Sequence, residues 1–230
     1  LARNSSSWRL DRAQQKAPVR EFAVFGFSIL GTEMLGAARL HADKLVVGAM
    51  LGTEALGIYY FAFNAGLGIT QSFVAACNLV VFPHLAKAHA GNALGELRKA
   101  FATGLALLAP VVAAQALLAP LYVPIVFGDN WIAATPFIVT LSCAALPLYA
   151  GSIVGAAYRA SGRPQAETLL TGFASAAALG GLALGAGASL EFACLGYGFG
   201  LAAVFLPAAI ASLSGRSFTP TAMTRTEGYQ

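Results

Sequence analysis

The chain has 230 residues, of which 57% are hydrophobic and only 10% are charged, and its mean hydropathy is +0.69. An ordinary water-soluble domain carries about 25% charged residues, so this composition excludes that class and indicates an integral membrane protein. The formal net charge is +4, but the basic residues lie in short stretches between apolar runs and not in a cluster with aromatic residues, which argues against a nucleic-acid partner.

Six apolar segments are long enough to cross a membrane, since about 20 mainly apolar residues span a hydrocarbon core of about 30 Å. They predict an all-α polytopic membrane protein with a bundle of six transmembrane helices. The expected helices are 21–51, 56–81, 99–126, 132–158, 165–188 and 192–213. Residues 1–20 are expected to form a cytoplasmic linker, and residues 214–230 a polar cytoplasmic tail.

The distribution of basic residues predicts the orientation of this bundle. If both termini face the cytoplasm, all but Arg39 and Lys44 of the 14 Lys and Arg residues fall in cytoplasmic segments. Cytoplasmic loops of membrane proteins carry such an excess. An even number of spans agrees with this placement, and we expect a multi-pass membrane protein with both termini in the cytoplasm.

The first expected helix, 21–51, contains three charged residues: Arg39, Asp43 and Lys44. Either they form an outside loop after a helix that ends near Ala38, or one long helix holds them in the outer half of the membrane. We favour the long helix, in which Arg39 and Asp43 lie four residues apart on one face and can pair. Ionisable residues at membrane depth face protein or a water-filled cavity, although Lys44 could also anchor the helix at the lipid headgroups.

The second expected helix, 56–81, carries a stripe of amides. Asn64, Gln71 and Asn78 are seven residues apart, nearly two full helical turns, and Tyr60 lies one turn before Asn64. Unpaired amides that face lipid are costly, so the stripe is expected to face other helices or water. Hydrogen bonding between helices and the lining of a cavity are equally compatible with it.

The later helices carry fewer polar side chains. Gln115 is a lone amide in the third helix, which also contains three prolines that can bend it, and Pro147 interrupts the fourth. Pairs of glycines four residues apart in the fifth and sixth helices, such as Gly181/Gly185 and Gly196/Gly200, are expected to let helices pack closely.

No motif for catalysis is present. There is no P-loop, HExxH or GxSxG pattern, and the three cysteines, all in apolar segments, have no metal-binding spacing. The three histidines form no same-face pair for a metal. We therefore expect no enzyme activity, no catalytic residues, no cofactor and no metal.

Four segments resemble one family of transporters in their order and spacing. They are 42–62 (ADKLVVGAMLGTEALGIYYFA), 81–85 (VFPHL), 127–136 (FGDNWIAATP) and 158–164 (YRASGRP). In this respect the chain is similar to polysaccharide biosynthesis flippases of the multidrug/oligosaccharidyl-lipid/polysaccharide exporter superfamily.

The resemblance implies one six-helix lobe, the C-terminal one, of a MATE-like two-lobe transporter. A missing N-terminal lobe of the same protein is then a partner, and the chain, which begins with Leu, is expected to be part of a longer one. The implied substrate is an undecaprenyl-pyrophosphate-linked oligosaccharide, flipped by alternating access across the bacterial inner (plasma) membrane, which is then the expected location of the protein. Other partners would be membrane lipid and, further along the pathway, a polysaccharide polymerase and glycosyltransferases.

The resemblance also implies a substrate cavity between the lobes. Its candidate lining residues are Arg39, Asp43, Lys44, Tyr60, Asn64, Gln71, Asn78 and Gln115. The basic residues would meet the pyrophosphate and the amides the sugar hydroxyls. The alternatives are an ion-coupled small-molecule or multidrug exporter of the same fold, and an inactive, truncated membrane scaffold.

Overall fold

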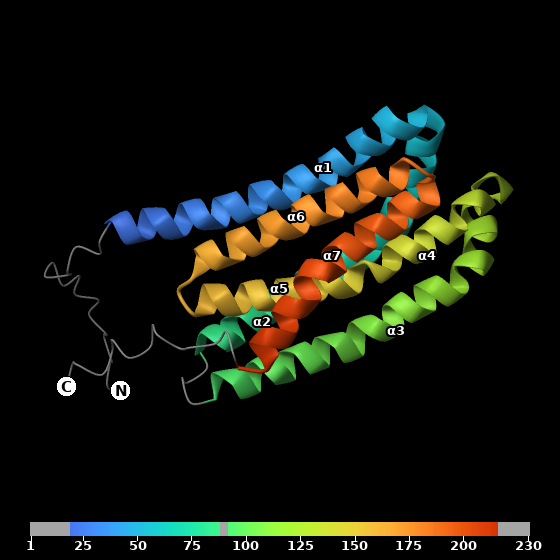
Figure 1. Cartoon of the computed structure of the whole chain (residues 1–230). Helices are drawn as coiled ribbons and strands as arrows, with labels where there is room; N and C mark the ends of the chain where they lie inside the picture. The colour runs from blue at the N-terminus through green and yellow to red at the C-terminus, as the bar shows by residue number, and fades with distance from the viewer. Residues whose placement is uncertain (1–18, 88–91, 216–230) are drawn as a thin grey trace, which may run out of the picture.

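The computed structural model of the chain describes residues 19–87 and 92–215, and within these residues it is all-helical (Figure 1). The predicted linker, apart from residues 19 and 20, and the predicted tail, apart from residues 214 and 215, lie outside the described residues. The elements in chain order are α1 (Val19–Phe63), the π-helix η1 (Asn64–Gly68), α2 (Ile69–Lys87), α3 (Ala93–Phe127), the 3₁₀-helix η2 (Asp129–Ala134), α4 (Thr135–Cys143), α5 (Ala145–Ala160), α6 (Pro164–Ala186) and α7 (Leu190–Leu213).

Five helical stretches of the described chain are long and apolar enough to cross a membrane. They are Ala23–Leu79, Ala93–Phe127, Asp129–Ala160, Pro164–Ala186 and Leu190–Leu213. The prediction of an all-helical membrane protein is thereby confirmed. The count differs from the six expected helices because the first two of them join into one helical stretch of 57 residues.

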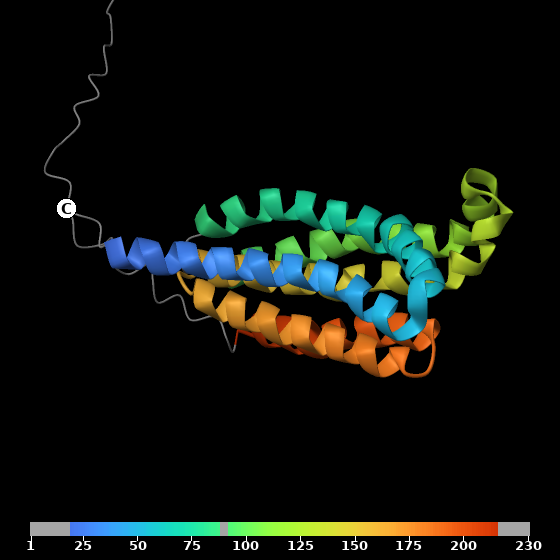
Figure 2. The same ribbon diagram turned by 90° about the horizontal axis from the view of Figure 1, so that it is seen from above.

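This first stretch changes direction at Gly52. The residue has φ 87° and ψ 178°, outside the helical region, and a positive φ of this kind is open to glycine but strained for residues with a Cβ. The chain runs along one side of the bundle up to this point and returns on the other side through η1 and α2 (Figure 2). A continuous helix through Arg39, Asp43 and Lys44 confirms the long first helix over the alternative with a loop.

The fourth expected helix, 132–158, is divided into η2, α4 and α5. Pro147 explains the break at Ala144, because proline has no N–H to donate to the carbonyl four residues earlier and its ring clashes with that carbonyl, here the one of Cys143. The three prolines of α3, in contrast, lie within an uninterrupted helix. That helix begins at Ala93, six residues before the predicted start of the third span.

The bundle has two distinct ends. At the reversal end lie the turn at Gly52, η2 and the connection from α6 to α7; at the terminal end α1 begins, α5 meets α6 and α7 finishes (Figure 1). Helix α5 lies in the middle, and most of its side chains are buried. Helices α6 and α7 pack with their backbones almost in contact, as the paired glycines predicted: a Cβ on Gly181 would lie 2.2 Å from the carbonyl oxygen of Gly196.

Candidate functional site

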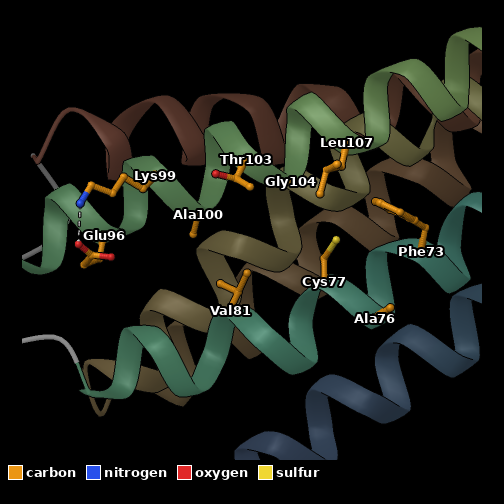
Figure 3. A pocket seen from close by; sticks show the side chains of 10 residues that line it. All are labelled: Phe73, Ala76, Cys77, Val81, Glu96, Lys99, Ala100, Thr103, Gly104 and Leu107. Carbon is orange, nitrogen blue, oxygen red and sulfur yellow. Dashed lines mark hydrogen bonds and ion pairs between the residues drawn. The ribbon is translucent and has the colours of Figure 1, made fainter.

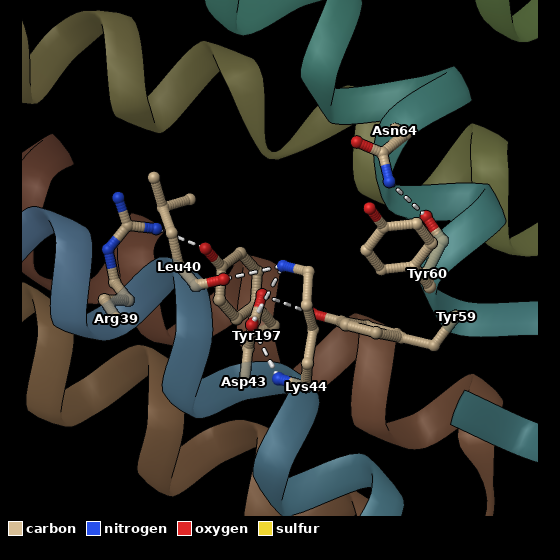
Figure 4. Close-up of polar contacts among 8 residues, drawn as sticks. All are labelled: Arg39, Leu40, Asp43, Lys44, Tyr59, Tyr60, Asn64 and Tyr197. Atoms are coloured by element: carbon tan, nitrogen blue, oxygen red, sulfur yellow. Dashed lines mark hydrogen bonds and ion pairs between the residues drawn. The ribbon is translucent and has the colours of Figure 1, made fainter. Parts of the chain in front are cut away.

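Charged and aromatic side chains from distant parts of the chain meet near the reversal end (Figure 4). Arg39, Asp43 and Lys44 come from the first part of α1, Tyr59 from its second part, and Tyr197 from α7. A helix rises about 1.5 Å per residue, so Asp43 lies about 14 Å along α1 from the turn at Gly52. Tyr59 lies about 10 Å beyond the same turn, and Tyr197 about 10 Å from the start of α7. These five residues, here called the charge cluster, therefore lie well inside two of the candidate membrane spans, Ala23–Leu79 and Leu190–Leu213.

Asp43 is the centre of the charge cluster and is fully buried, with 0% exposure. Its Oδ1 accepts hydrogen bonds from the Lys44 backbone N–H at 2.6 Å and from the Lys44 Nζ at 3.2 Å, where the two form an ion pair. Its Oδ2 accepts a hydrogen bond from the Tyr59 hydroxyl at 3.1 Å. Both oxygens of this carboxylate thus have partners, as a buried charge requires.

Lys44 lies at the edge of the charge cluster, with 21% of its side chain exposed. Besides the pair with Asp43, its Nζ donates to the carbonyl oxygen of Leu40 at 2.6 Å and lies 4.0 Å from the centre of the Phe63 ring. The aromatic face and the carbonyl partly replace the water that this ammonium loses. Protein contacts therefore hold the Lys44 ammonium.

Arg39 is buried, with 7% exposure, and donates a hydrogen bond to the Tyr197 hydroxyl. Its guanidinium carbon lies 5.8 Å from the centre of the same ring. The spacing of four residues allowed Arg39 to pair with Asp43, but the structure shows no such pair: within the described part of the chain no carboxylate lies within ion-pair distance of Arg39. Tyr197 from α7 takes the guanidinium, while Lys44 lies against Asp43.

The charge cluster contains more positive than negative charge. It contains two cations and one carboxylate, and that carboxylate is occupied by Lys44 and Tyr59. The Arg39 guanidinium has five N–H donors in a planar fork, of which the described contacts use one. A buried cation without a counter-ion is costly, so the arrangement favours an anionic ligand.

The amide stripe of the second expected helix is not uniform. Asn64 is exposed, and its amide donates to the carbonyl oxygen of Tyr60 in its own helix at 2.7 Å, while the Tyr60 side chain is 56% exposed. Gln71 is half-buried, and the Oδ1 of Asn78 is buried without a partner among the described residues. The cause is η1, because a π-helix takes more residues per turn than an α-helix and changes the phase between Asn64 and Gln71.

Gln115 has a structural role that its position alone did not reveal. Its Nε2 donates to the carbonyl oxygens of Ala65 and Gly66, the latter at 3.0 Å, and both lie within η1. A π-helix leaves some carbonyls poorly paired, and lipid offers no substitute donor. Gln115 from α3 therefore stabilises the irregular turn that leads from α1 into α2.

This role predicts different effects for two amides that look alike in the sequence. Gln115→Leu is expected to destabilise the protein by about 1–2 kcal/mol, because it removes the donor from buried carbonyls. Asn64→Leu is the matched control and is expected to change stability by less than about 0.5 kcal/mol, since its amide is exposed. The measurement is the unfolding temperature of both variants in detergent; an equal decrease for both would contradict the role of Gln115.

The sequence did not reveal several members of the site. Tyr59 and Tyr197 lie in apolar helical segments, and no sequence spacing connects them with Arg39, Asp43 and Lys44. Glu167 was also missed; it is buried at the terminal end, and its Oε2 lies 3.3 Å from the Nε of Arg159. No group of three potential metal ligands was found among the described residues.

Comparisons with known proteins match mainly the first half of the chain. Residues 3–136 match the model of a family described as "Polysaccharide biosynthesis protein". The teichuronic acid biosynthesis protein TuaB of Bacillus subtilis (strain 168) is 26% identical over 128 residues. This match covers 54% of the chain but only 26% of TuaB, so the chain spans about a quarter of the curated relative that it matches. No solved structure matches the chain.

Proposed function

The chain belongs to the polysaccharide biosynthesis protein family, and from this we propose that it forms one lobe of a transporter that flips lipid-linked oligosaccharides across the bacterial inner membrane. The family match includes α1, η1, α2 and α3, and hence every member of the charge cluster except Tyr197. The name of the relative TuaB connects that protein with the biosynthesis of teichuronic acid, which supports a glycan as the cargo.

We infer that the lobe crosses the membrane six times. The stretch Ala23–Leu79 has 57 residues, about 85 Å of helix, which is far more than one crossing of about 30 Å requires. The change of direction at Gly52 divides it into two crossings. Six crossings place the beginning of α1 and the end of α7 on the same side.

The terminal end is the cytoplasmic one in this proposal. Among the described residues, Arg98, Lys99, Arg159 and Arg163 lie in or beside the connections at that end. Of the basic residues in 19–87 and 92–215, only Arg39 and Lys44 lie in the half near the reversal end, and they belong to the charge cluster. This asymmetry is the one that orients membrane proteins with their basic loops inside.

The observation that carries the proposal is the buried guanidinium of Arg39, which contacts a tyrosine and has no carboxylate within ion-pair distance among the described residues. Such a fork suits the oxygens of a pyrophosphate, which accept two parallel hydrogen bonds. Lys44, at the exposed edge of the charge cluster, adds a second positive charge. The exposed Tyr60 and Asn64 on the next turns can bind sugar hydroxyls.

The alternative of a cation-coupled drug exporter requires a carboxylate that is free to bind the cation. In the charge cluster both Asp43 oxygens are occupied, by Lys44 and Tyr59. The cluster therefore favours an anionic cargo over a cationic one. Under this proposal the remaining partners are a second lobe of the same protein and the enzymes that make and polymerise the repeat unit.

Deletion of the gene in its host tests the proposal. We expect lipid-linked oligosaccharide to accumulate in the inner leaflet and surface polysaccharide to be lost, because the repeat unit no longer crosses the membrane. The measurement is the amount of lipid-linked oligosaccharide in membrane extracts, with the reintroduced gene as control. A deletion strain with normal export and no accumulation would contradict the proposal.

A further inference from the structure

A cleft of about 520 Å³ opens between α2 and α3 (Figure 3), and no residue of the charge cluster lines it. Apart from Glu96, Lys99 and Thr103, its walls are apolar or carry a thiol. The lining residues are Phe73, Ala76, Cys77, Val81, Glu96, Lys99, Ala100, Thr103, Gly104 and Leu107.

The polarity of the cleft changes along its length. Lys99 and Glu96 lie at the terminal end, Thr103 follows one turn deeper on α3, and Leu107 lies a further turn down, opposite Phe73 of α2 (Figure 3). From Lys99 to Leu107 the helix rises about 12 Å. One leaflet of hydrocarbon is about 15 Å deep, half of the membrane core. The cleft therefore starts where headgroups lie and extends through most of one leaflet.

The inner wall of the cleft is apolar because its side chains are small or apolar, and the backbone of α3 is paired within the helix and held by Tyr149 from behind. Tyr149 of α5 donates its hydroxyl to the carbonyl oxygen of Ala100 at 2.9 Å. The adjacent Gly104 leaves room for this ring, since a Cβ there would lie 1.9 Å from the tyrosine oxygen. With small residues on α3 and no free polar backbone, the wall suits a hydrocarbon chain better than water.

The mouth of the cleft carries one cation and one carboxylate, Lys99 and Glu96. Lys99 is exposed over 72% of its side chain, and its Nζ donates one hydrogen bond, at 3.1 Å, to Glu96. The neighbouring Arg98 is exposed and donates its Nε to the carbonyl oxygen of Leu213 at 2.9 Å. Lys99 and Glu96 balance each other in charge, and Arg98, beside them on α3 but outside the lining of the cleft, adds one positive charge. Basic pockets between helices at the cytoplasmic surface bind anionic lipid headgroups.

We propose that this cleft binds an anionic phospholipid of the leaflet at the terminal end, with one acyl chain between α2 and α3 and the phosphate at Lys99. The apolar walls hold the chain without regard to the headgroup. Lys99 supplies the preference for a negative headgroup, because its ammonium has two further N–H donors for the phosphate. The site is separate from the charge cluster and does not depend on the transport proposal.

Two native cysteines provide the test. Cys77 lines this cleft, and Cys143 is exposed and lines a different one, between α4, α5 and α7. The purified protein in detergent is treated with a maleimide in the presence of phosphatidylglycerol or phosphatidylcholine, and mass spectrometry follows the two cysteines separately. We expect phosphatidylglycerol to slow the modification of Cys77 about fivefold more than phosphatidylcholine does, the preference that one lysine gives for an anionic headgroup.

The variant Lys99→Gln separates the charge from the shape of the cleft. It is expected to abolish the difference between the two lipids at Cys77 while the rate at Cys143 stays unchanged throughout. Equal protection of Cys77 by both lipids in the unchanged protein, or no protection by either, overturns the proposal. The same holds if Cys77 is unreactive without added lipid, because the cleft is then closed, or if Lys99→Gln keeps the preference for phosphatidylglycerol.

Discussion

Replacing Arg39 with alanine is expected to abolish glycan export while the protein still inserts into the membrane. Insertion into the membrane depends on the hydropathy of the apolar stretches. Removing the charge of Arg39 makes the first stretch more apolar, so insertion should not suffer. Transport depends on the guanidinium, because a hydrogen bond to a charged group contributes about 1.5–3 kcal/mol. Its loss should lower export at least about tenfold. The measurement is the ratio of exported glycan to lipid-linked oligosaccharide at equal amounts of membrane protein.

Two further variants show whether the charge or the packing of Arg39 is responsible. Tyr197→Phe removes the hydrogen-bond partner of Arg39 and leaves the cation in place, so export should fall less than in Arg39→Ala. Arg39→Lys keeps a positive charge but loses the planar fork, and an intermediate effect is expected. Normal export in Arg39→Ala, with normal amounts of protein, would remove this residue from the substrate path.

The helices themselves could be predicted from hydropathy, because a chain in lipid must satisfy its backbone within each span. The expected segments 165–188 and 192–213 differ from α6 and α7 by no more than two residues at either end. Their beginnings have local causes, since Pro164 suits the first turn of a helix and the Ser189 side chain accepts a hydrogen bond from the backbone of Phe192.

The irregular parts of the bundle were harder to predict, for two different reasons. The break before α5 follows from Pro147 and was expected at that residue. The π-helix η1 is stabilised by Gln115, about fifty residues further along the chain, and no local pattern around Asn64 indicates it. The regular spacing of the three amides therefore predicted a straight stripe that the extra residue in η1 disturbs.

The charge cluster was predicted in part. Charged residues within an apolar segment stand out, and so Arg39, Asp43 and Lys44 could be identified from the sequence. The partners of these residues could not be identified, because sequence spacing shows only which side chains of the same helix are neighbours. Tyr197, whose hydroxyl accepts a hydrogen bond from Arg39, lies 158 residues further along the chain, in a helix where it resembles the other apolar positions.

Replacing Gly181 with alanine is expected to destabilise the whole bundle. The new Cβ would lie 2.2 Å from the carbonyl oxygen of Gly196, and this oxygen belongs to the backbone of α7, which cannot rotate away as a side chain can. The approach is mutual, since a Cβ on Gly196 would lie 2.1 Å from the carbonyl oxygen of Gly181. Overpacking costs about 1–3 kcal/mol, and a backbone obstacle places this variant at the upper end.

The neighbouring Gly180 is the matched control, because a Cβ there meets nothing within 4 Å. Alanine is the better helix former by about 1 kcal/mol, so Gly180→Ala should leave the unfolding temperature in detergent unchanged or raise it. The same decrease in both variants would show that helix flexibility, and not close packing, matters here. Gly181→Ala should also lower export at permissive temperature: Gly196 precedes Tyr197, so pushing α7 away moves that hydroxyl from Arg39, which Gly180→Ala does not do.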